Sequence, residues 1–467
     1  MLAFAIFAVT FVVVLIAAVI YFYPGSTKTS TIPGMDPTDP REGNFPDIGA
    51  AGSMHEFLAN LHETYGTIAS FWFGTKFTVS IASPELFKEH MGVFDRPPEL
   101  FALFKPLIGR SSIHYANKAD GRRRRIMYDP PFTQANLRNY CGTFNELACE
   151  LEKKLLGLPK DEHLPLMQYC HALVIKALTR IFFGDYFKDE GNILKFRHSF
   201  EICWSEMETS LTQCPAEDGS DRDKKFKEAL GFMHDSIRAI MKKRKAKPVV
   251  GSTLFIDVLL ENELPEEQVL DDCLSYMMGA FHTSGNLMAW TIYFLATHQD
   301  CQEKLHQEVT KVKGQVEQSQ LDQLKYLHHV INESLRLSIL TPYAARFQDS
   351  DTELGGHIIP AGTSVYHALG VVLEDPEIWP EPQKFDPERF SEDNITQRQE
   401  TGFQPFGFAG KRSCPGQHFA YAQMTIFLAV LCRTLKFNLV EGQVVVPRYG
   451  LVTSPEEEIW VTVEKRK

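Results

Sequence analysis

The sequence predicts a mainly α-helical domain with a small β component, preceded by a single N-terminal transmembrane helix. Between residues 136 and about 329, apolar residues recur at three- and four-residue spacing and prolines are few, which is typical of packed helices. Strand-like segments return late in the chain, at residues 356–360 and 442–446. Residues 2–23 contain no charge and consist mostly of Phe, Val, Ile, Leu and Ala.

The apolar N-terminal segment is long enough to span a membrane. At about 1.5 Å per residue, a helix over residues 2–23 crosses a bilayer core of about 30 Å. A cleaved signal peptide is the alternative, but it would have a basic residue before a shorter apolar run and a small-residue cleavage site after it. We therefore expect residues 1–24 to be a retained signal-anchor in the endoplasmic reticulum membrane. Because Lys28 and Arg41 follow the span, the positive-inside rule places the rest of the chain in the cytosol.

The remaining chain is expected to form one domain. Residues 25–50 are rich in proline and glycine, which indicates a stiff linker, and no second linker follows, so residues 51–467 are predicted to fold as a unit. With 44% hydrophobic residues in 467, the chain can bury a large core. Its net charge of -11 argues against general affinity for nucleic acid. The nine cysteines form no CxxC pairs, so most are expected to be reduced thiols.

One cysteine stands in an unusual setting. Residues 405–416, Pro-Phe-Gly-Phe-Ala-Gly-Lys-Arg-Ser-Cys-Pro-Gly, form a glycine-rich turn that runs into a helix predicted to begin near Gln417. Such a turn can hold Cys414 as a thiolate at a helix N-terminus, and its glycines let a flat macrocycle approach the backbone. The alternative is a buried cysteine in an ordinary glycine turn. A phosphate-binding P-loop is excluded, because no glycine stands five residues before Gly410 and Arg412 occupies the Ser/Thr position.

This loop resembles the haem-binding signature of the cytochromes P450. Gly410, Arg412, Cys414 and Gly416 fall at the signature's spacings. The resemblance implies the cytochrome P450 fold, haem b (iron protoporphyrin IX) as cofactor and Cys414 as the axial ligand of the iron. A thiolate ligand pushes electron density onto the iron and favours cleavage of the O–O bond. The signature's phenylalanine is replaced by Gly407, so the aromatic shield of the sulfur differs in detail, with Phe406 and Phe408 on either side.

A second motif supports the resemblance. Glu333 and Arg336 lie one helical turn apart and can pair, which alone usually makes a surface ion pair of little worth. Pro387-Glu388-Arg389-Phe390 follows at the family's distance. The resemblance implies that Glu333, Arg336 and Arg389 form a buried structural network behind the haem.

The propionates of a haem need cations, and guanidinium groups suit carboxylates. Besides Arg412, the resemblance assigns this role to Arg346, beyond the Glu333 helix, and to Arg125. In the family, a tryptophan normally stands four residues before the arginine that matches Arg125. Gly121 stands there in this chain, so one hydrogen bond to a propionate is expected to be missing. The basic run at residues 122–125 is by default a solvated helix face, and part of it could meet an acidic electron donor.

Residues 279–284, Gly-Ala-Phe-His-Thr-Ser, resemble the family's distal oxygen-activating motif. Thr283 takes the place of the threonine whose hydroxyl takes part in proton delivery. His282 takes the place of the acid, either as a proton relay near neutral pH or as a core-facing histidine, and both interpretations stay open. Candidate pocket walls, carried over by position, are Phe101, Phe104, Ala280, Phe281, Thr283, Leu340, Thr341, Leu451 and Val452.

We therefore expect a monooxygenase that inserts one oxygen atom of O2 into an apolar, lipid- or sterol-like substrate. Because the chain has no GxGxxG motif, its electrons are expected from a separate NADPH–cytochrome P450 reductase, with cytochrome b5 as a further candidate. The start of the chain and residues 55–58 and 368–373 resemble cytochrome P450 family 20, an orphan animal family without a settled substrate class. The rival hypotheses are a haem-thiolate isomerase or dehydratase needing no reductase, and a non-enzymatic haem protein that binds or senses a ligand.

Overall fold

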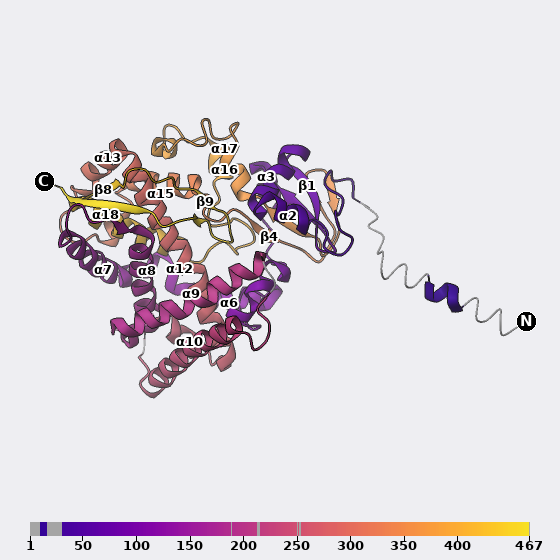
Figure 1. Ribbon diagram of the computed structural model, residues 1–467, viewed down its shortest axis with the longest axis horizontal. Coiled ribbons are helices and arrows are strands. Elements are labelled where there is room, and N and C mark those ends of the chain that lie inside the picture. Colours follow the sequence, from indigo (N-terminus) through magenta and orange to yellow (C-terminus); the bar gives the residue numbers. More distant parts are fainter. Residues whose placement is uncertain are drawn as a thin grey trace, which may run out of the picture.

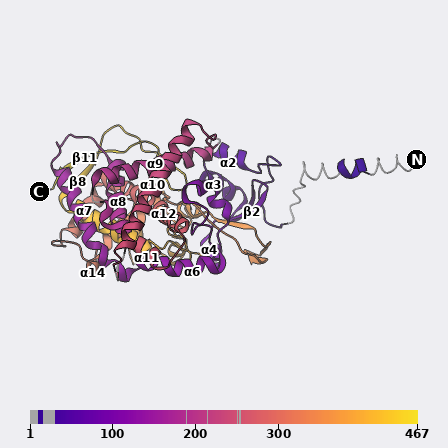
Figure 2. The same cartoon turned by 90° about the horizontal axis from the view of Figure 1, so that it is seen from below.

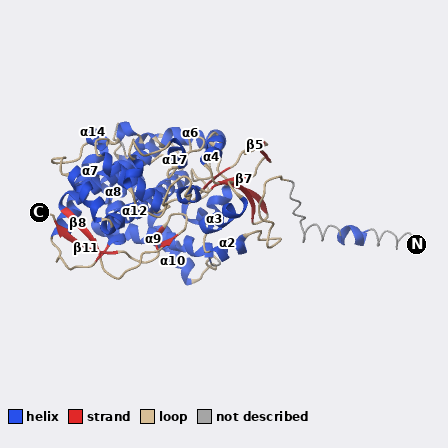
Figure 3. Cartoon of the chain, turned by 90° about the horizontal axis from the view of Figure 1, so that it is seen from above, coloured by secondary structure: helices blue, strands red, loops and turns tan. Residues whose placement is uncertain are grey.

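The computed structural model describes residues 10–15, 30–187, 189–212, 215–249, 251 and 254–466. Helices make up most of the body, and most of the strands lie toward its two ends (Figure 3). This confirms the predicted fold class, mainly α with a small β component.

Most of the predicted signal-anchor, residues 1–24, lies outside the described residues; of that segment the structure describes residues 10–15, which are helical. Within the described ranges, no helix combines the length and the apolar character needed to cross a bilayer.

The described part of the predicted linker packs against the body. Gly34 bridges Ser70 and Gly43 bridges Phe73, both in strand β1 (Ile68–Phe73), and the side chain of Ile32 is 1% exposed. Helix α2 (Phe45–Ala51) begins inside the stretch that the sequence predicts to be a linker, and its first turn contains Pro46, a favoured position for proline.

Helix α12 (Glu266–Thr297) runs through the middle of the body (Figures 1 and 2). It is apolar on almost every side, which is typical of a helix surrounded by protein. Pro265 precedes it, and Glu266 and Glu267 in its first turn favour the positive end of the helix dipole. It packs against α5 (Lys105–Ile108), α8 (Leu166–Phe183), α15 (Lys325–Leu337) and α18 (Gln417–Thr434). The segment predicted to carry oxygen chemistry, residues 279–284, thus lies at the centre of the fold.

The body contains further long helices. They are α7 (Arg138–Leu156), α8 (Leu166–Phe183), α9 (Glu190–Thr212), α10 (Asp221–Ala246), α13 (Gln299–Val309), α15 (Lys325–Leu337) and α18 (Gln417–Thr434). Shorter helices are α3 (Met54–Tyr65), α4 (Pro84–His90), α5 (Lys105–Ile108), α6 (Lys118–Tyr128), α11 (Phe255–Glu261), α14 (Gln318–Leu321), α16 (Leu369–Glu374) and α17 (Gln397–Gly402).

The largest sheet has the strand order β1-β2-β7-β4, with β2 (Lys76–Ile81), β7 (Ser364–His367) and β4 (Ala344–Arg346). The hairpin β1-β2 is antiparallel, β2 runs parallel to β7, and β4 pairs antiparallel with β7. This pairing fixes Arg346, whose backbone partner is Val365. The remaining sheets join β3 (Leu164–Pro165), β11 (Trp460–Lys465) and β8 (Leu435–Leu439); β5 (Thr352–Leu354) and β6 (His357–Ile359); and β9 (Pro447–Arg448) and β10 (Ser454–Pro455).

One of the two late strand segments predicted from the sequence is present in the structure. Strand β6 falls within residues 356–360, whereas residues 442–446 contain no strand. The prediction for 442–446 is wrong because Gly442, with φ of 82°, turns the chain there, and the side chain of Gln443 bonds the backbone of Trp460 in place of a ladder.

Two hydrophobic cores result, a large one among the helices and a smaller one beside the β1-β2-β7-β4 sheet. The cysteine loop contributes to both, since Phe406 packs against the first and Phe408 against the second.

Candidate haem-thiolate site

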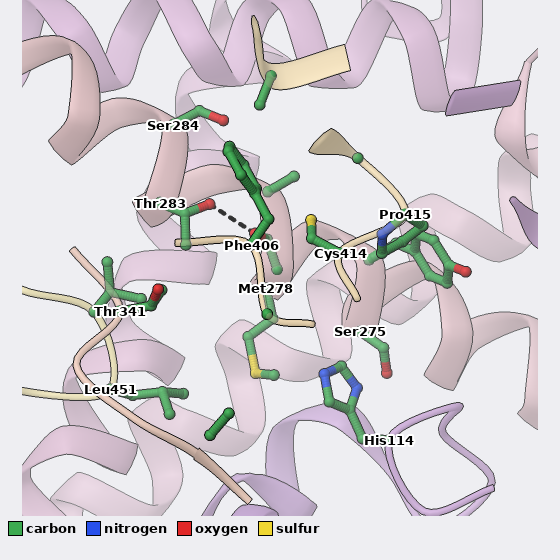
Figure 4. Close-up of a pocket in the computed structure, with 18 of the residues that line it drawn as sticks. His114, Ser275, Met278, Thr283, Ser284, Thr341, Phe406, Cys414, Pro415 and Leu451 are labelled. Carbon is green, nitrogen blue, oxygen red and sulfur yellow. Dashed lines mark hydrogen bonds between the residues drawn. The ribbon is translucent and has the colours of Figure 1, made fainter. Parts of the chain in front are cut away.

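A cavity of about 300 Å³ opens beside the middle of α12 and is lined by the cysteine loop, the segment before α6 and the chain around residue 451. Cys414, Thr283 and Phe406 all line it, although Cys414 and Thr283 lie more than 100 positions apart in sequence (Figure 4). The walls are mostly apolar, and a few polar side chains converge on it. Such a lining is typical of a site for a cofactor or small molecule.

The cysteine loop is held in shape by glycines with left-handed backbone. Gly407 has φ of 73° and Gly410 has φ of 65°, and the Cys414 N–H donates to the Phe406 carbonyl over 2.8 Å. A Cβ on Gly410 would lie 2.3 Å from the carbonyl oxygen of Val93, so no larger residue fits there. Helix α18 begins just after the loop, at Gln417, so the sulfur stands near a helix N-terminus, as expected.

Burial raises the pKa of the Cys414 thiol. The backbone N–H of Gly416 and the guanidinium groups of Arg125 and Arg96 act in the opposite direction. The pocket therefore holds a thiol whose anionic form the fold only partly stabilises. A bound metal ion, which deprotonates a coordinating thiol, would supply the remaining positive charge.

The two phenylalanines of the cysteine loop, Phe406 and Phe408, pack into different parts of the protein. Phe406 lines the cavity and packs on Tyr421 in a tilted arrangement at 5.3 Å between ring centroids. Phe408 turns into the sheet-side core, where it stacks on Phe87 at 4.8 Å. Of the two, Phe406 is therefore the one that lines the cavity together with Cys414.

Arginines gather around the loop. Arg125 donates to the Ser413 carbonyl over 2.9 Å, and Arg96 and Arg346 approach the Arg412 carbonyl at 3.4 and 3.3 Å. All four guanidinium groups line the cavity. Their pairing with carboxylates is incomplete, since Arg125 pairs with Asp129 while the Nε atoms of buried Arg346 and Arg412 have no hydrogen-bond partner in the described structure.

Burial and this crowding of positive charge lower the pKa values of the arginines in the cluster. Burial, followed by the neighbouring arginines, lowers the pKa of Arg412 to about 8 and that of Arg96 to about 10. Burial also lowers the pKa of Arg346 well below its ordinary value. Buried cations are stable when anions pair with them. The cavity is therefore suited to a ligand that brings carboxylates to these arginines.

Arg412 is tied tightly to its surroundings. Its side chain is 1% exposed and donates to the carbonyls of Ala116 and Ile113, the latter over 2.5 Å. Its guanidinium also stacks on Phe94 at 4.9 Å from the ring centroid. These contacts anchor the segment before α6 to the cysteine loop.

The two distal candidates on α12 point in different directions. Thr283 lines the cavity, and its hydroxyl donates to the Gly279 carbonyl over 2.7 Å, the bond marked in Figure 4. His282 is 8% exposed, lies off the cavity wall and packs on Trp204 at 4.3 Å between ring centroids. Burial, with help from His171 and Arg197, lowers the pKa of His282 well below its ordinary value. The packing favours the interpretation of His282 as a core-facing histidine.

A buried ion network lies behind the cysteine loop. Glu333 is 0% exposed and accepts from Arg336 over 2.7 and 2.9 Å, and Arg389 Nε lies 3.3 Å from the same carboxylate. Arg336 also donates to the Leu373 carbonyl and Glu333 accepts from the Asp386 N–H. None of these side chains lines the cavity, which fits a structural role.

Most of the expected pocket walls line the cavity. These are Phe101, Ala280, Thr283, Leu340, Thr341, Leu451 and Val452. Phe104 and Phe281 do not; both are buried in the helical core, where Phe104 packs on Trp204 and Phe281 packs on His171. The sequence reasoning missed Arg96 and His114, which also line the cavity.

Comparison with known proteins identifies the family of the chain. The sequence profile of the family "Cytochrome P450" matches residues 33–463. Cytochrome P450 20A1 of Bos taurus and that of Homo sapiens are each 36% identical to the chain over 468 residues, covering 100% of both sequences. Secologanin synthase 2 of Catharanthus roseus is 26% identical over 88% of the chain and 86% of its own length.

The helical fold and the cysteine-bearing cavity define a haem-thiolate enzyme. The chain belongs to the cytochrome P450 family and is a cytochrome P450 monooxygenase, as the sequence predicts, with relatives in family 20. The cofactor of this family is haem b. The residues present fit that group, because a thiol stands in the cavity and two buried guanidinium groups around it keep unpaired Nε atoms for anionic propionates.

Proposed function

We propose that the enzyme inserts one oxygen atom of O2 into an apolar, lipid- or sterol-like substrate, with electrons from a separate NADPH–cytochrome P450 reductase. The observation that carries this proposal is the cavity itself, in which the Cys414 thiol and the Thr283 hydroxyl lie on the wall of a largely apolar space. An apolar wall favours an apolar substrate, since burial removes the substrate's surface from water.

The contacts around the cysteine loop support a set of residues that we propose bind the haem. Cys414 would supply the thiolate ligand, Arg125, Arg346 and Arg412 would pair with the propionates, and Arg96 would add a fourth cation. Gly410 shapes the loop, since a Cβ there would lie 2.3 Å from the Val93 carbonyl oxygen, and Gly416 and Phe406 line the same cavity as Cys414. When bound, the haem supplies the redox chemistry that cleaves O2, and thiolate ligation favours that cleavage.

The proposed proton chemistry rests on Thr283. Its hydroxyl proton is held on the Gly279 carbonyl, and its lone pairs remain open to the cavity. Such a hydroxyl can accept a hydrogen bond from water while passing its own proton toward the reacting oxygen. His282 would act from behind the helix, by fixing the packing of α12 against Trp204, rather than by touching the cavity.

The electron donor and the membrane complete the proposal. Arg122 and Arg123 are exposed on α6, the helix that also presents Arg125 to the cysteine loop, so this face is suited to an acidic reductase or to cytochrome b5. Residues 1–24 would anchor the enzyme in the endoplasmic reticulum membrane, with the catalytic domain in the cytosol and the substrate delivered partly from the lipid.

The test is reconstitution of the haem-loaded full chain with NADPH–cytochrome P450 reductase in lipid vesicles. Apolar lipids and sterols that shift the haem spin state are then incubated with NADPH under 18O2. The proposal predicts a product that carries one 18O atom and forms only with reductase and NADPH. Product formation without reductase would indicate an isomerase or dehydratase, and spin-state change without any product would indicate a ligand-binding protein; either result contradicts the proposal.

A further inference from the structure

A chain of hydrogen bonds leads from α12 to a histidine in the cavity wall. Ser275 Oγ donates to the Asp271 carbonyl over 2.6 Å and lies 2.6 Å from Ser112 Oγ. Ser112 Oγ in turn lies 3.3 Å from His114 Nδ1 and accepts from the His114 backbone N–H over 3.1 Å. The imidazole of His114 points into the cavity (Figure 4).

The order of donors along this chain fixes the tautomer of His114. A serine hydroxyl carries one proton, and that of Ser275 is used on the Asp271 carbonyl. In the short contact between the two hydroxyls, Ser112 is therefore the donor and Ser275 Oγ the acceptor. Ser112 has no proton left for the imidazole, so His114 Nδ1 must be the donor in their contact. The other ring nitrogen, Nε2, then carries a lone pair and no proton.

Burial keeps this lone pair free of a proton. Burial, followed by the charges of Arg96, Arg412 and Arg125, lowers the pKa of His114 well below its ordinary value. In the described structure, no residue hydrogen-bonds His114 Nε2. Two hydroxyls of the same cavity have also used their protons on backbone carbonyls, since Thr283 donates to Gly279 and Thr341 donates to Pro405. These cavity side chains therefore present acceptors.

We propose that His114 Nε2 accepts a hydrogen bond from a hydroxyl group of the substrate, so that the enzyme selects apolar molecules that carry an alcohol. The inference deepens the proposed function and rests on it. A carboxylate, including a haem propionate, has no proton to give to Nε2, and an ammonium group would have to bury its charge among mostly apolar walls. A neutral hydroxyl on an apolar skeleton satisfies both the nitrogen and the walls.

The test uses two isomers, decan-1-ol and 1-methoxynonane, which have the same atoms but differ in whether the oxygen carries a proton. Their affinities for the haem-loaded full chain are measured by equilibrium dialysis, with the reduced iron saturated with carbon monoxide so that neither oxygen can bind the metal. Decan-1-ol should bind about tenfold more tightly, which is the upper range expected of one hydrogen bond.

Variants assign the preference to the histidine. His114→Phe should bring the two affinities within about twofold of each other without weakening the ether, whereas His114→Gln, whose amide oxygen is an acceptor, should retain a preference for the alcohol. Ser112→Ala should reduce the preference, because the imidazole is then free to place its proton on Nε2. The control is Phe101→Leu, at the ring that packs on His114 at 4.5 Å, which should weaken both ligands alike.

Each outcome decides the matter. Equal affinities in the wild type, or a preference for the ether, would overturn the role of His114 while leaving the proposed monooxygenase intact, because an apolar ligand still binds. A preference that survives in His114→Phe would assign the acceptor to another group. Failure of both probes, and of decane, to bind at all would instead overturn the proposed function. If His114→Phe does not load haem, the comparison of His114→Gln and Ser112→Ala with the wild type decides.

Discussion

The guanidinium of Arg412 occupies the space beside Gly121. A Cβ built on Gly121 would lie 2.7 Å from Arg412 Nη1 and 2.4 Å from the Ala116 carbonyl oxygen, and that carbonyl also accepts from Arg412. The family's tryptophan at this position is therefore sterically excluded by the path that Arg412 takes here. The glycine and the arginine form one arrangement, in which the Arg412 guanidinium takes the space that a side chain at residue 121 would need.

Gly121→Ala should therefore destabilise the protein and loosen its haem. The new methyl group must displace backbone as well as Arg412, and such overpacking typically costs about 1–3 kcal/mol. Urea unfolding and the rate of haem transfer to an acceptor protein measure the two effects. The control is Gly142→Ala on the exposed face of α7, where nothing lies within 4 Å and the substitution should stabilise the helix by about 0.5–1 kcal/mol. Equal effects at both glycines would contradict the arrangement.

Glu333→Gln should prevent accumulation of the folded haem protein. The substitution leaves Arg336, which is 1% exposed, without its charged partner, and breaking a buried ion pair from one side costs about 3–5 kcal/mol. Haem content per polypeptide after expression is the measurement. Glu392→Gln, at an exposed ion pair with Lys325, is the matched control and should leave haem content unchanged. Normal haem content in Glu333→Gln would show that the network is dispensable.

The buried carboxyl of Asp272 should make stability depend on pH. Burial raises its pKa to about 6, against bonds from Tyr128 and the charge of Arg124. The folded state then holds this proton up to about pH 6, whereas the unfolded state releases it near pH 4. Its contribution to stability is therefore present below pH 4 and lost as pH rises through 6, on the order of 2–3 kcal/mol for a shift of about two units.

Asp272→Asn should accordingly lose less stability than the wild type when unfolding at pH 5 and pH 7 is compared. The amide oxygen can still accept from the Ile113 N–H, which donates to Asp272 over 2.7 Å. Asp235→Asn, at an exposed carboxylate, should behave as the wild type does. An identical pH dependence in wild type and Asp272→Asn would remove this carboxyl from the account.

Thr283→Ala should divert reducing equivalents from product to hydrogen peroxide while haem and substrate still bind. Loss of a group that serves in general acid catalysis costs on the order of a hundredfold or more. The measurement is product formed per NADPH consumed with reductase. Thr291→Ala is the control, because Thr291 makes the same bond within α12, to the Leu287 carbonyl over 2.7 Å, but lies off the cavity. Equal coupling in the two variants would reduce Thr283 to a structural residue.

The sequence predicted those parts of this site whose residues lie close together in the chain. The spacing of Gly410, Arg412, Cys414 and Gly416 places a sulfur, a cation and two backbone turns within one loop, so proximity in the chain guarantees proximity in space. The Glu333 and Arg336 pair follows in the same way from one helical turn. The helical class follows from periodicity, which depends only on neighbours along the chain.

What sequence reasoning missed depends on tertiary packing. Arg96 and His114 belong to irregular segments whose direction is set by contacts with Asn117, Ser112 and α12. The side of α12 on which His282 lies depends on the helices around it, because a helix that is apolar on all sides gives no periodic signal of orientation. The sequence does show a lone histidine shortly after two serines. That pattern indicates the hydrogen-bond chain to His114 only once Ser275 is known to lie beside Ser112.

The role of Cys414 is the central claim, and one spectrum tests it most directly. The reduced, carbon monoxide-treated full chain should give the absorption typical of thiolate-ligated haem, and Cys414→Ala should abolish that absorption. Cys432→Ala, at a buried cysteine of α18 that lies off the cavity, should leave it intact. An undiminished thiolate-type spectrum in Cys414→Ala would contradict the assignment of the axial ligand and the site built on it.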